Sequence, residues 1–131
     1  MSTAVIDASV WCDALLPGER RAAARAALES YTKLAAPEHL RLEIANVLRR
    51  HARNELSDVQ ASAVLNVIRE MAIEVVPTAD LLPRVWELRG NLTAYEAAYV
   101  ATAEHLGAPL LTRDKGLLAQ AGLVRCAIQA V

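Results

Sequence analysis

The sequence has few of the residues that define specialised small proteins. It contains only two cysteines, Cys12 and Cys126, far apart and without a Cys-x-x-Cys spacing, which argues against a disulfide framework and a zinc site. No glycine-rich turn follows the first apolar segment, so a dinucleotide site is excluded. No apolar run approaches the ~20 residues that span a bilayer, and no basic leader opens the chain, so we expect a cytoplasmic protein without a membrane segment.

Neither sign of charge dominates the sequence. Lys and Arg total 14 against 15 Asp and Glu, a formal net charge of −1, so overall electrostatics gives no argument for a nucleic-acid partner. The chain is instead rich in apolar residues, with 54% hydrophobic against 22% charged, a balance typical of a packed globular fold. Because 131 residues suit one ordinary domain, we expect a single domain over residues 1–131.

Short apolar segments alternate with helical patterns along the chain. Strands are predicted over residues 3–8, 34–37, 73–77, 108–114 and 124–129. Helices are predicted over residues 19–33, 37–54, 57–72, 78–90, 93–107 and 115–122. Right-handed crossovers between parallel strands lay helices on both faces of a sheet. The sequence therefore predicts an α/β fold of three layers, α/β/α, with a central parallel sheet of about five strands.

Individual residues mark several helix ends. Pro37 is expected in the first turn of the helix 37–54, and Ser57 with Gln60 forms a capping-box pattern at the start of the next helix. Pro83 lies about one turn inside the helix 78–90, so that helix is expected to start late or to kink. Gly107 is the expected stop of the helix 93–107.

Two aspartates follow apolar strands directly. Asp7 ends the first predicted strand and Asp114 follows the fourth. Ligands bind open α/β sheets at the carboxyl ends of the strands, so we expect both carboxylates at one edge of the sheet. Each could instead cap the helix that follows it.

Two glutamates are further candidates. Glu43 shares the apolar stripe of Ile44, and an unpaired buried carboxylate costs several kcal/mol, so a metal or an arginine is the expected partner. Asn46 could lie along the edge of the same patch. Glu96 forms a capping-box pattern with Thr93 but also lies on the inward side of its helix, so both a structural and a functional role remain open.

The segments that carry these acids together resemble a known family. The resemblance rests on "VIDAS", "LEIANVLRR" and "LTAYEAAYVATAEHLGAPLLTRD", in this order and over essentially the whole chain. They look like a PIN-domain ribonuclease, specifically the VapC-type toxin of toxin–antitoxin pairs. The resemblance implies an acidic quartet around Mg²⁺ or Mn²⁺, with two hydroxyl helpers: Asp7, Glu43, Glu96 and Asp114, with Ser9 and Thr112. Members of this family usually carry Asp where this chain has Glu96.

The implied activity is a Mg²⁺-dependent endoribonuclease that hydrolyses phosphodiester bonds with a metal-activated water. The resemblance also implies a homodimer and a small cognate antitoxin protein. An RNA substrate would need cations beside the acids, and the candidates are Arg41, Arg113 and Lys115, with Arg49, Arg50 and Arg53 on the same helix as Glu43. Aromatic residues make up only 4% of the chain, which favours recognition of a folded RNA by shape and phosphate over base stacking.

Other classes fit less well. A receiver domain needs a phosphoacceptor Asp where Pro77 stands, and a haloacid dehalogenase needs a second acid two residues after Asp7, where Ser9 stands. The histidines show no ligand spacing and are expected on helix surfaces or boundaries: His39, His51 and His105. The remaining alternative is a PIN-like scaffold that binds RNA or a protein partner without cleaving.

Overall fold

Five parallel strands form the centre of the molecule. In the computed structural model, which describes residues 2–51 and 56–131, the strands are β1 (Thr3–Ile6), β2 (Lys33–Pro37), β3 (Glu74–Val76), β4 (Leu110–Thr112) and β5 (Ile128–Ala130). Their order is β3-β2-β1-β4-β5 and every neighbouring pair is parallel. The predicted fold class is confirmed. The strand order reverses at β1, where the chain moves first to β2 and later to β4.

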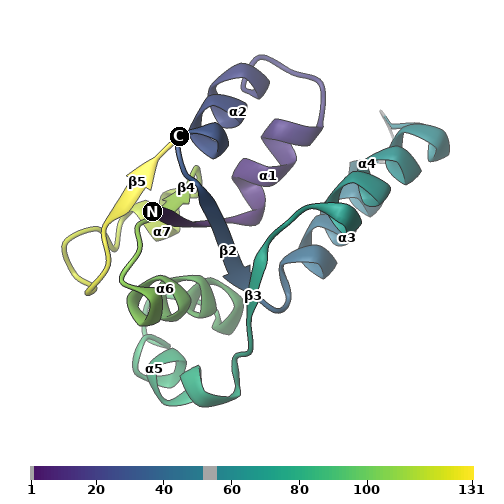
Figure 1. The fold of residues 1–131 in the computed structure, drawn as a ribbon. Coiled ribbons are helices and arrows are strands. Elements are labelled where there is room, and N and C mark those ends of the chain that lie inside the picture. Colours follow the sequence, from purple (N-terminus) through teal and green to yellow (C-terminus); the bar gives the residue numbers. More distant parts are fainter. Residues whose placement is uncertain (1, 52–55) are drawn as a thin grey trace.

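Helices cover both faces of this sheet. They are α1 (Ala8–Leu15), α2 (Arg21–Glu29), α3 (Leu40–His51), α4 (Asp58–Glu70), the 3₁₀ turn η1 (Ala79–Leu81), α5 (Leu82–Glu87), α6 (Ala94–Leu106) and α7 (Lys115–Leu118). Figure 1 shows α1 and α2 on one side of the sheet and α5 and α6 on the other. α3 and α4 form an arm that extends away from the sheet (Figure 1). No helix in the described part of the chain is long and apolar enough to cross a membrane.

Burial on both faces explains the sequence of the central strands. Ala4, Val5 and Ile6 of β1 are fully buried, as are Ala35 and Ala36 of β2. A strand that is covered on both sides needs apolar residues throughout, in place of an alternating pattern.

Most predicted helix signals appear in the structure. Both side-chain bonds of the capping box are present at Ser57 and Gln60, where α4 begins. Pro83 lies in the first turn of α5, where backbone N–H groups have no partner within the helix, so its missing N–H costs no hydrogen bond. The predicted late start of this helix is confirmed. Gly107 ends α6 with φ of 62°, a left-handed conformation that glycine adopts without steric cost.

Three predictions about element bounds are wrong. α1 was not predicted, because the first strand was expected to continue to residue 8; it ends at Ile6, and the apolar face of α1 packs into the core. Pro37 is the last residue of β2, not a first-turn residue, because the ladder continues to the Glu38 N–H, which donates to the Val76 carbonyl at 3.1 Å. The last strand is β5, shorter and later than the predicted 124–129.

Candidate active site

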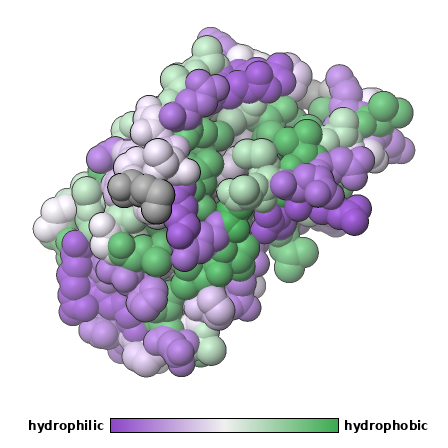
Figure 2. All heavy atoms as spheres, in the orientation of Figure 1, coloured by the Kyte–Doolittle hydropathy of each residue, from purple (hydrophilic) through white to green (hydrophobic). Residues whose placement is uncertain are grey.

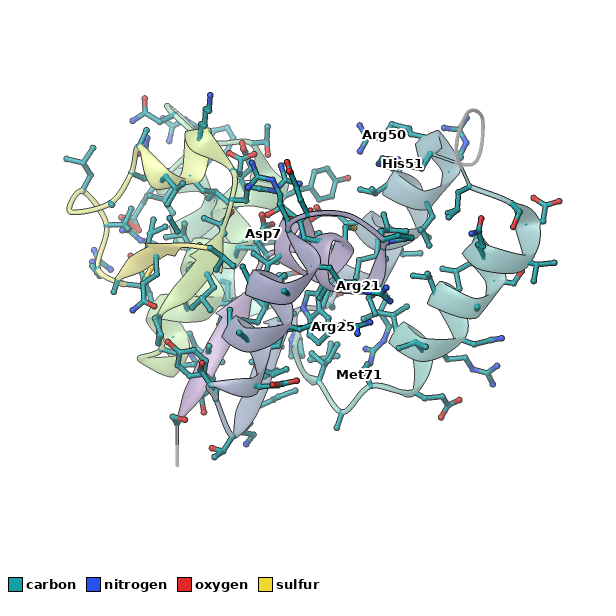
Figure 3. All side chains as sticks on the ribbon, turned by 90° about the horizontal axis from the view of Figure 1, so that it is seen from above. Asp7, Arg21, Arg25, Arg50, His51 and Met71 are labelled. Carbon is teal, nitrogen blue, oxygen red and sulfur yellow. The ribbon has the colours of Figure 1, made fainter. Side chains whose placement is uncertain are left out.

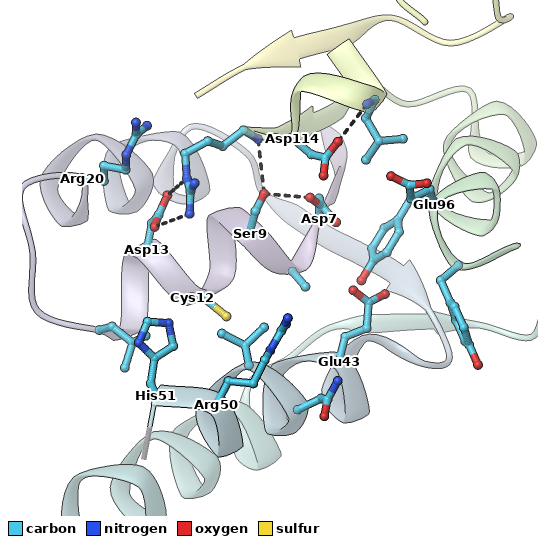
Figure 4. Close-up of a pocket in the computed structure, with 18 of the residues that line it drawn as sticks. Asp7, Ser9, Cys12, Asp13, Arg20, Glu43, Arg50, His51, Glu96 and Asp114 are labelled. Atoms are coloured by element: carbon cyan, nitrogen blue, oxygen red, sulfur yellow. Dashed lines mark hydrogen bonds and ion pairs between the residues drawn. The ribbon is translucent and has the colours of Figure 1, made fainter. Parts of the chain in front are cut away.

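A pocket of about 1010 Å³ lies at the carboxyl ends of the strands, and all four predicted acids line it. Asp7 follows β1, Glu43 lies on α3, Glu96 on α6, and Asp114 follows β4. β1 and β4 are neighbours in the sheet, which is why two aspartates 107 positions apart open onto the same space (Figure 4). The structure thus brings together carboxylates from four separate elements.

Asp7 is buried and held by two hydroxyls. Only 6% of the residue is exposed. Its Oδ2 accepts hydrogen bonds from Ser9 Oγ at 2.7 Å and Thr112 Oγ1 at 2.8 Å. Its side chain makes no capping bond to α1, so the capping alternative is wrong for this residue. Burial raises the Asp7 pKa; the bonds from Ser9 and Thr112 oppose this rise, and the charge of Glu43 adds to it.

Thr112 connects the two aspartates. While its hydroxyl donates to Asp7, its oxygen accepts from the backbone N–H of Asp114 at 3.0 Å. Ser9 similarly accepts from the backbone N–H of Arg113 at 3.2 Å. The two hydroxyl residues that the resemblance implied therefore fix the end of β4 against the end of β1.

Asp114 and Glu96 approach each other across a glycine. Asp114 caps α7, with its Oδ1 accepting from the Leu117 N–H at 3.0 Å, so the capping interpretation holds here. A Cβ on Gly116 would stand 3.0 Å from Asp114 Oδ1 and 3.6 Å from Glu96 Oε2. Any other residue at this position would crowd Asp114 Oδ1 and touch Glu96 Oε2 at ordinary van der Waals distance. Sequence reasoning missed Gly116, and only its place just after Asp114 hinted at a role.

Glu96 caps α6 and also lines the pocket. Its Oε1 accepts from the Thr93 N–H at 2.8 Å and its own N–H donates to Thr93 Oγ1 at 3.2 Å, which completes the capping box of α6. The second oxygen, Oε2, is the one near Gly116 and Asp114. One carboxylate oxygen holds the helix end, and the other reaches the pocket.

Glu43 lies beside a histidine. Among the described residues, no arginine or lysine forms an ion pair with Glu43. His39 Nε2 lies 2.7 Å from Glu43 Oε1, but neither atom has a hydrogen bond of good geometry. The His39 ring packs edge-on against Tyr99 with centroids 5.1 Å apart. His39 stands just before α3 and His51 is its exposed last residue, which agrees with the predicted helix-boundary positions, and both also line the pocket.

The Tyr99 hydroxyl is a buried polar group that lies near Glu43 and makes no hydrogen bond of good geometry within the described residues. The residue is 1% exposed and lines the pocket. Burial and the nearby charges of Glu43 and Asp7 all raise the Tyr99 pKa, so the phenol stays protonated and can donate. Cys12 also lines the pocket, but burial, with the charges of Asp13 and Asp7, raises its pKa to about 12, so it is no thiolate at neutral pH.

The donor set of this pocket suits a hard divalent cation. Its oxygens are carboxylates and hydroxyls, the ligand types that Mg²⁺ prefers. Among the described residues, both Glu43 Oε1 and the Tyr99 hydroxyl are buried atoms without a hydrogen bond of good geometry. In residues 2–51 and 56–131, however, no three His, Cys, Asp or Glu side chains are arranged to hold an ion. Unpaired like charges repel, so the four acids share a pocket without converging on a point.

The cations that line the pocket match the predicted ones in part: Arg113 and Arg50 were predicted and line it, whereas Arg20 and Arg21 were not predicted. Arg113 forms a two-point ion pair with Asp13, at 2.6 and 3.1 Å. Arg41 donates to the Ile68 and Met71 carbonyls, both at 2.9 Å, and so holds the end of α4 against α3. Neither Arg41 nor Lys115 lines the pocket, and Arg53 lies outside the described residues.

Three other arginines line the pocket, together with the predicted Asn46: Arg20, Arg21 and Arg50. Figure 3 shows Arg21, on α2, and Arg50, on α3, both to one side of Asp7. Sequence analysis did not single out Arg20 and Arg21, because nothing local shows that the chain after α1 turns back over the sheet edge.

Comparison with known proteins identifies the family. The model of the PIN domain matches residues 4–123, so the chain belongs to the PIN-domain family. Ribonuclease VapC9 of Mycobacterium tuberculosis is 38% identical over 129 residues, which cover 97% of this chain and 97% of that protein. Within the PIN domains, the chain therefore belongs to the VapC ribonucleases, the toxins of toxin–antitoxin systems.

Solved structures share the fold of this chain. PAE2754 from Pyrobaculum aerophilum has a TM-score of 0.73 at 29% identity, covering 99% of this chain and 90% of that one. VapBC-5 from Mycobacterium tuberculosis, a member of the VapBC family of toxin–antitoxin systems, has a TM-score of 0.58 at 18% identity, covering 100% of this chain and 98% of that one. The second likeness concerns the fold alone.

Proposed function

We propose that this chain is a Mg²⁺-dependent or Mn²⁺-dependent endoribonuclease, the toxin of a type II toxin–antitoxin pair, acting on RNA in the cytoplasm. The observation that carries the proposal is the pocket. Its four acids come from four elements, and among the described residues none of them pairs with an arginine or lysine: Asp7, Glu43, Glu96 and Asp114. Four carboxylates gathered in one pocket without an arginine or lysine partner favour a cation from outside the chain.

The same four residues would hold the metal ion. The chemistry that a bound divalent cation would supply is polarisation of the scissile phosphate and activation of a water for in-line attack. Ser9 and Thr112 fix the Asp7 carboxylate through its Oδ2, which leaves Oδ1 for other ligands. The protonated Tyr99 hydroxyl can donate to an oxygen in the pocket, and Asn46 on its rim can bind a water or the substrate. The products would carry a 5′-phosphate and a 3′-hydroxyl.

The direct test is cleavage of RNA by the purified chain. We expect fragments when total RNA is incubated with the chain and Mg²⁺ or Mn²⁺, and none when EDTA is in excess or when Asp7→Asn replaces the wild type. Primer extension then maps the cleaved sites. Metal-independent cleavage, or equal cleavage by Asp7→Asn, would refute the mechanism. A lack of any product with either metal would favour the non-cleaving scaffold.

Glu96 allows its structural and functional roles to be separated. Glu96→Gln keeps the capping box, because Gln also reaches back to the Thr93 N–H, but it removes the charge that faces Asp114. We expect the free energy of unfolding to stay within about 0.5 kcal/mol of the wild type while cleavage needs more Mg²⁺. Mn²⁺ binding, followed by isothermal titration calorimetry, should weaken in parallel. Unchanged metal binding and cleavage would assign Glu96 to capping alone.

We also propose that the chain forms a homodimer and binds a cognate antitoxin. The arm of α3 and α4 supports this, because it leaves large apolar side chains exposed: Leu42, Val59, Leu65 and Val67. Figure 2 shows hydrophobic residues at the surface of this arm, interspersed with hydrophilic ones. Apolar surface of this kind is typical of interfaces. Light scattering of the purified chain should give twice the mass of 14.2 kDa; a monomer well above micromolar concentration would contradict the dimer.

A further inference from the structure

The pocket is larger than its acidic centre and carries the opposite charge at its far end. Figure 4 shows Glu96 and Arg20 at opposite ends, with Asp7 and Ser9 between them, and Arg50 reaching from α3 into the space near Glu43. Within the described residues, Arg20, Arg21 and Arg50 form no ion pair or hydrogen bond through their side chains, and Arg21 Nε is a buried donor without a partner. Arg113, in contrast, is already neutralised by Asp13.

At the acidic end, an aromatic ring stands open to solvent. Tyr95 is 66% exposed and lines the pocket, although it lies in the first turn of α6 next to Glu96. Its ring is braced on one side by His39, with centroids 5.3 Å apart and the planes tilted by 59°. His39 is itself held by Tyr99 and contacts Glu43. The Tyr95 ring is therefore positioned against His39, the residue that contacts Glu43, while most of its surface stays free.

We propose that Tyr95 is a stacking platform for one unpaired nucleobase next to the scissile phosphate, and that the RNA backbone continues toward Arg50, Arg21 and Arg20. This inference rests on the proposed nuclease function and extends it to substrate recognition. Every nucleobase has a face that can stack on an aromatic ring, and guanidinium groups bind phosphates. A strand with bases and phosphates is the ligand that needs a ring, an acidic metal site and arginines in one pocket.

The platform also specifies which part of an RNA can enter. A paired base has its faces covered by its neighbours, so stacking on Tyr95 requires a base that is unstacked, as in a loop or bulge. One exposed ring is enough for one such base, so the low aromatic content of the chain does not conflict with this mode. A folded RNA recognised by shape and phosphate would present its cleaved nucleotide in a loop.

The test measures binding separately from cleavage. The parent protein is Asp7→Asn, in which the RNA is not consumed, and the probes are fluorescein-labelled single-stranded ten-nucleotide oligo(A) and a ten-unit strand of abasic ribose phosphates, both with Mg²⁺ present. We expect the parent to bind oligo(A) roughly 5-fold to 100-fold more tightly than the abasic strand, the range that corresponds to one stacked base. Tyr95→Ala should abolish this preference, and Tyr95→Phe should keep it.

Two further variants distinguish stacking from charge and from general surface effects. Arg50→Gln should weaken the binding of both probes by the same factor. It should also lower the slope of log Kd against log salt by about one. Trp86→Ala is the matched control, because Trp86 is also 66% exposed but lies outside the pocket, and it should leave the preference unchanged.

The platform is refuted if Tyr95→Ala weakens both probes equally, if Tyr95→Phe also loses the preference, or if the parent shows none. The nuclease proposal is decided separately, by Mg²⁺-dependent cleavage with the wild type. Cleavage without a base preference would refute the stacking platform and support the nuclease proposal. A base preference without cleavage would support the stacking platform and refute the nuclease proposal.

Discussion

Asp7→Asn is expected to lower Mg²⁺-dependent RNA cleavage by at least about 10³-fold and to leave the protein folded, because a metal site supplies several kcal/mol of transition-state charge stabilisation. The neutral amide is a poor ligand for a hard cation. It is a good substitute in the fold, since Ser9 and Thr112 both donate to the same oxygen, Oδ2, and the amide oxygen of Asn can accept both bonds. Initial rates of cleavage at saturating Mg²⁺ measure the loss.

Thermal unfolding of the same variant tests the cost of burying this charge. Burial raises the Asp7 pKa above its ordinary value of 3.8, so the folded protein keeps a proton at pH values where the unfolded chain has lost it. The stability that this proton contributes is fully present below the pKa that Asp7 has in the unfolded chain. It is lost as the pH rises through the pKa of Asp7 in the folded protein. At pH 7 without metal, the Tm of Asp7→Asn should equal or exceed that of the wild type, and the difference should shrink as the pH falls toward 4.

Asp13→Asn is the matched control for both measurements. It removes a carboxylate from the same pocket, but one that Arg113 already neutralises, so cleavage should fall by less than about tenfold. If the two variants lose activity equally, the loss reflects the charge of the pocket and not a metal ligand. If Asp7→Asn unfolds instead, Asp7 is a structural residue and the proposed mechanism fails.

The sequence could predict what depends on local chemistry and on the sheet. Apolar runs defined the strands, and the rule that parallel strands end at one edge placed Asp7 and Asp114 in the same pocket. The capping pattern of Glu96 predicted its bond to the Thr93 N–H, because that bond spans only three residues. The resemblance to a family supplied the quartet, Ser9 and Thr112.

Which groups the arginine side chains bind could not be predicted in the same way. Arg113 pairs with Asp13, and Arg41 donates to the Ile68 and Met71 carbonyls; these contacts depend on how α1 lies against β4 and how α4 folds back on α3. The arginines at 20 and 21 enter the pocket only because the chain reverses after α1. α1 itself was hidden, because the end of a short apolar strand and the start of an apolar helix read as one segment.

The second large effect concerns an ion pair on the other side of the sheet. Arg84 of α5 donates to both oxygens of Glu104 on α6, at 2.7 and 3.0 Å, and the Arg125 N–H donates to the same carboxylate at 2.7 Å. The Glu104 side chain is only 8% exposed. Burial alone would raise the Glu104 pKa, but the hydrogen bonds from Arg84 and Arg125 outweigh burial and lower it.

Arg84→Leu should therefore reduce the free energy of unfolding by about 3 kcal/mol at pH 7, because it leaves Glu104 buried with one backbone donor. Because the pKa of Glu104 is lowered in the folded protein, the ion pair stabilises the fold at pH values above the pKa of Glu104 in the unfolded chain. This stabilisation is lost as the pH falls through the pKa of Glu104 in the folded protein. The difference between wild type and variant should thus narrow at pH 3. Urea unfolding at both pH values measures it.

Two further variants decide whether the loss of stability in Arg84→Leu comes from charge or from packing. Arg84→Leu combined with Glu104→Leu should recover much of the loss, since an apolar pair can replace a buried ion pair. Arg89→Leu removes an exposed arginine of the same region, one that lies over the Trp86 ring at 4.4 Å, and should cost less than about 1 kcal/mol. A double variant as unstable as Arg84→Leu alone would show that the arginine stabilises α5 by packing. Because α6 carries both Tyr95 and Glu96, this pair also holds the helix that presents one end of the pocket.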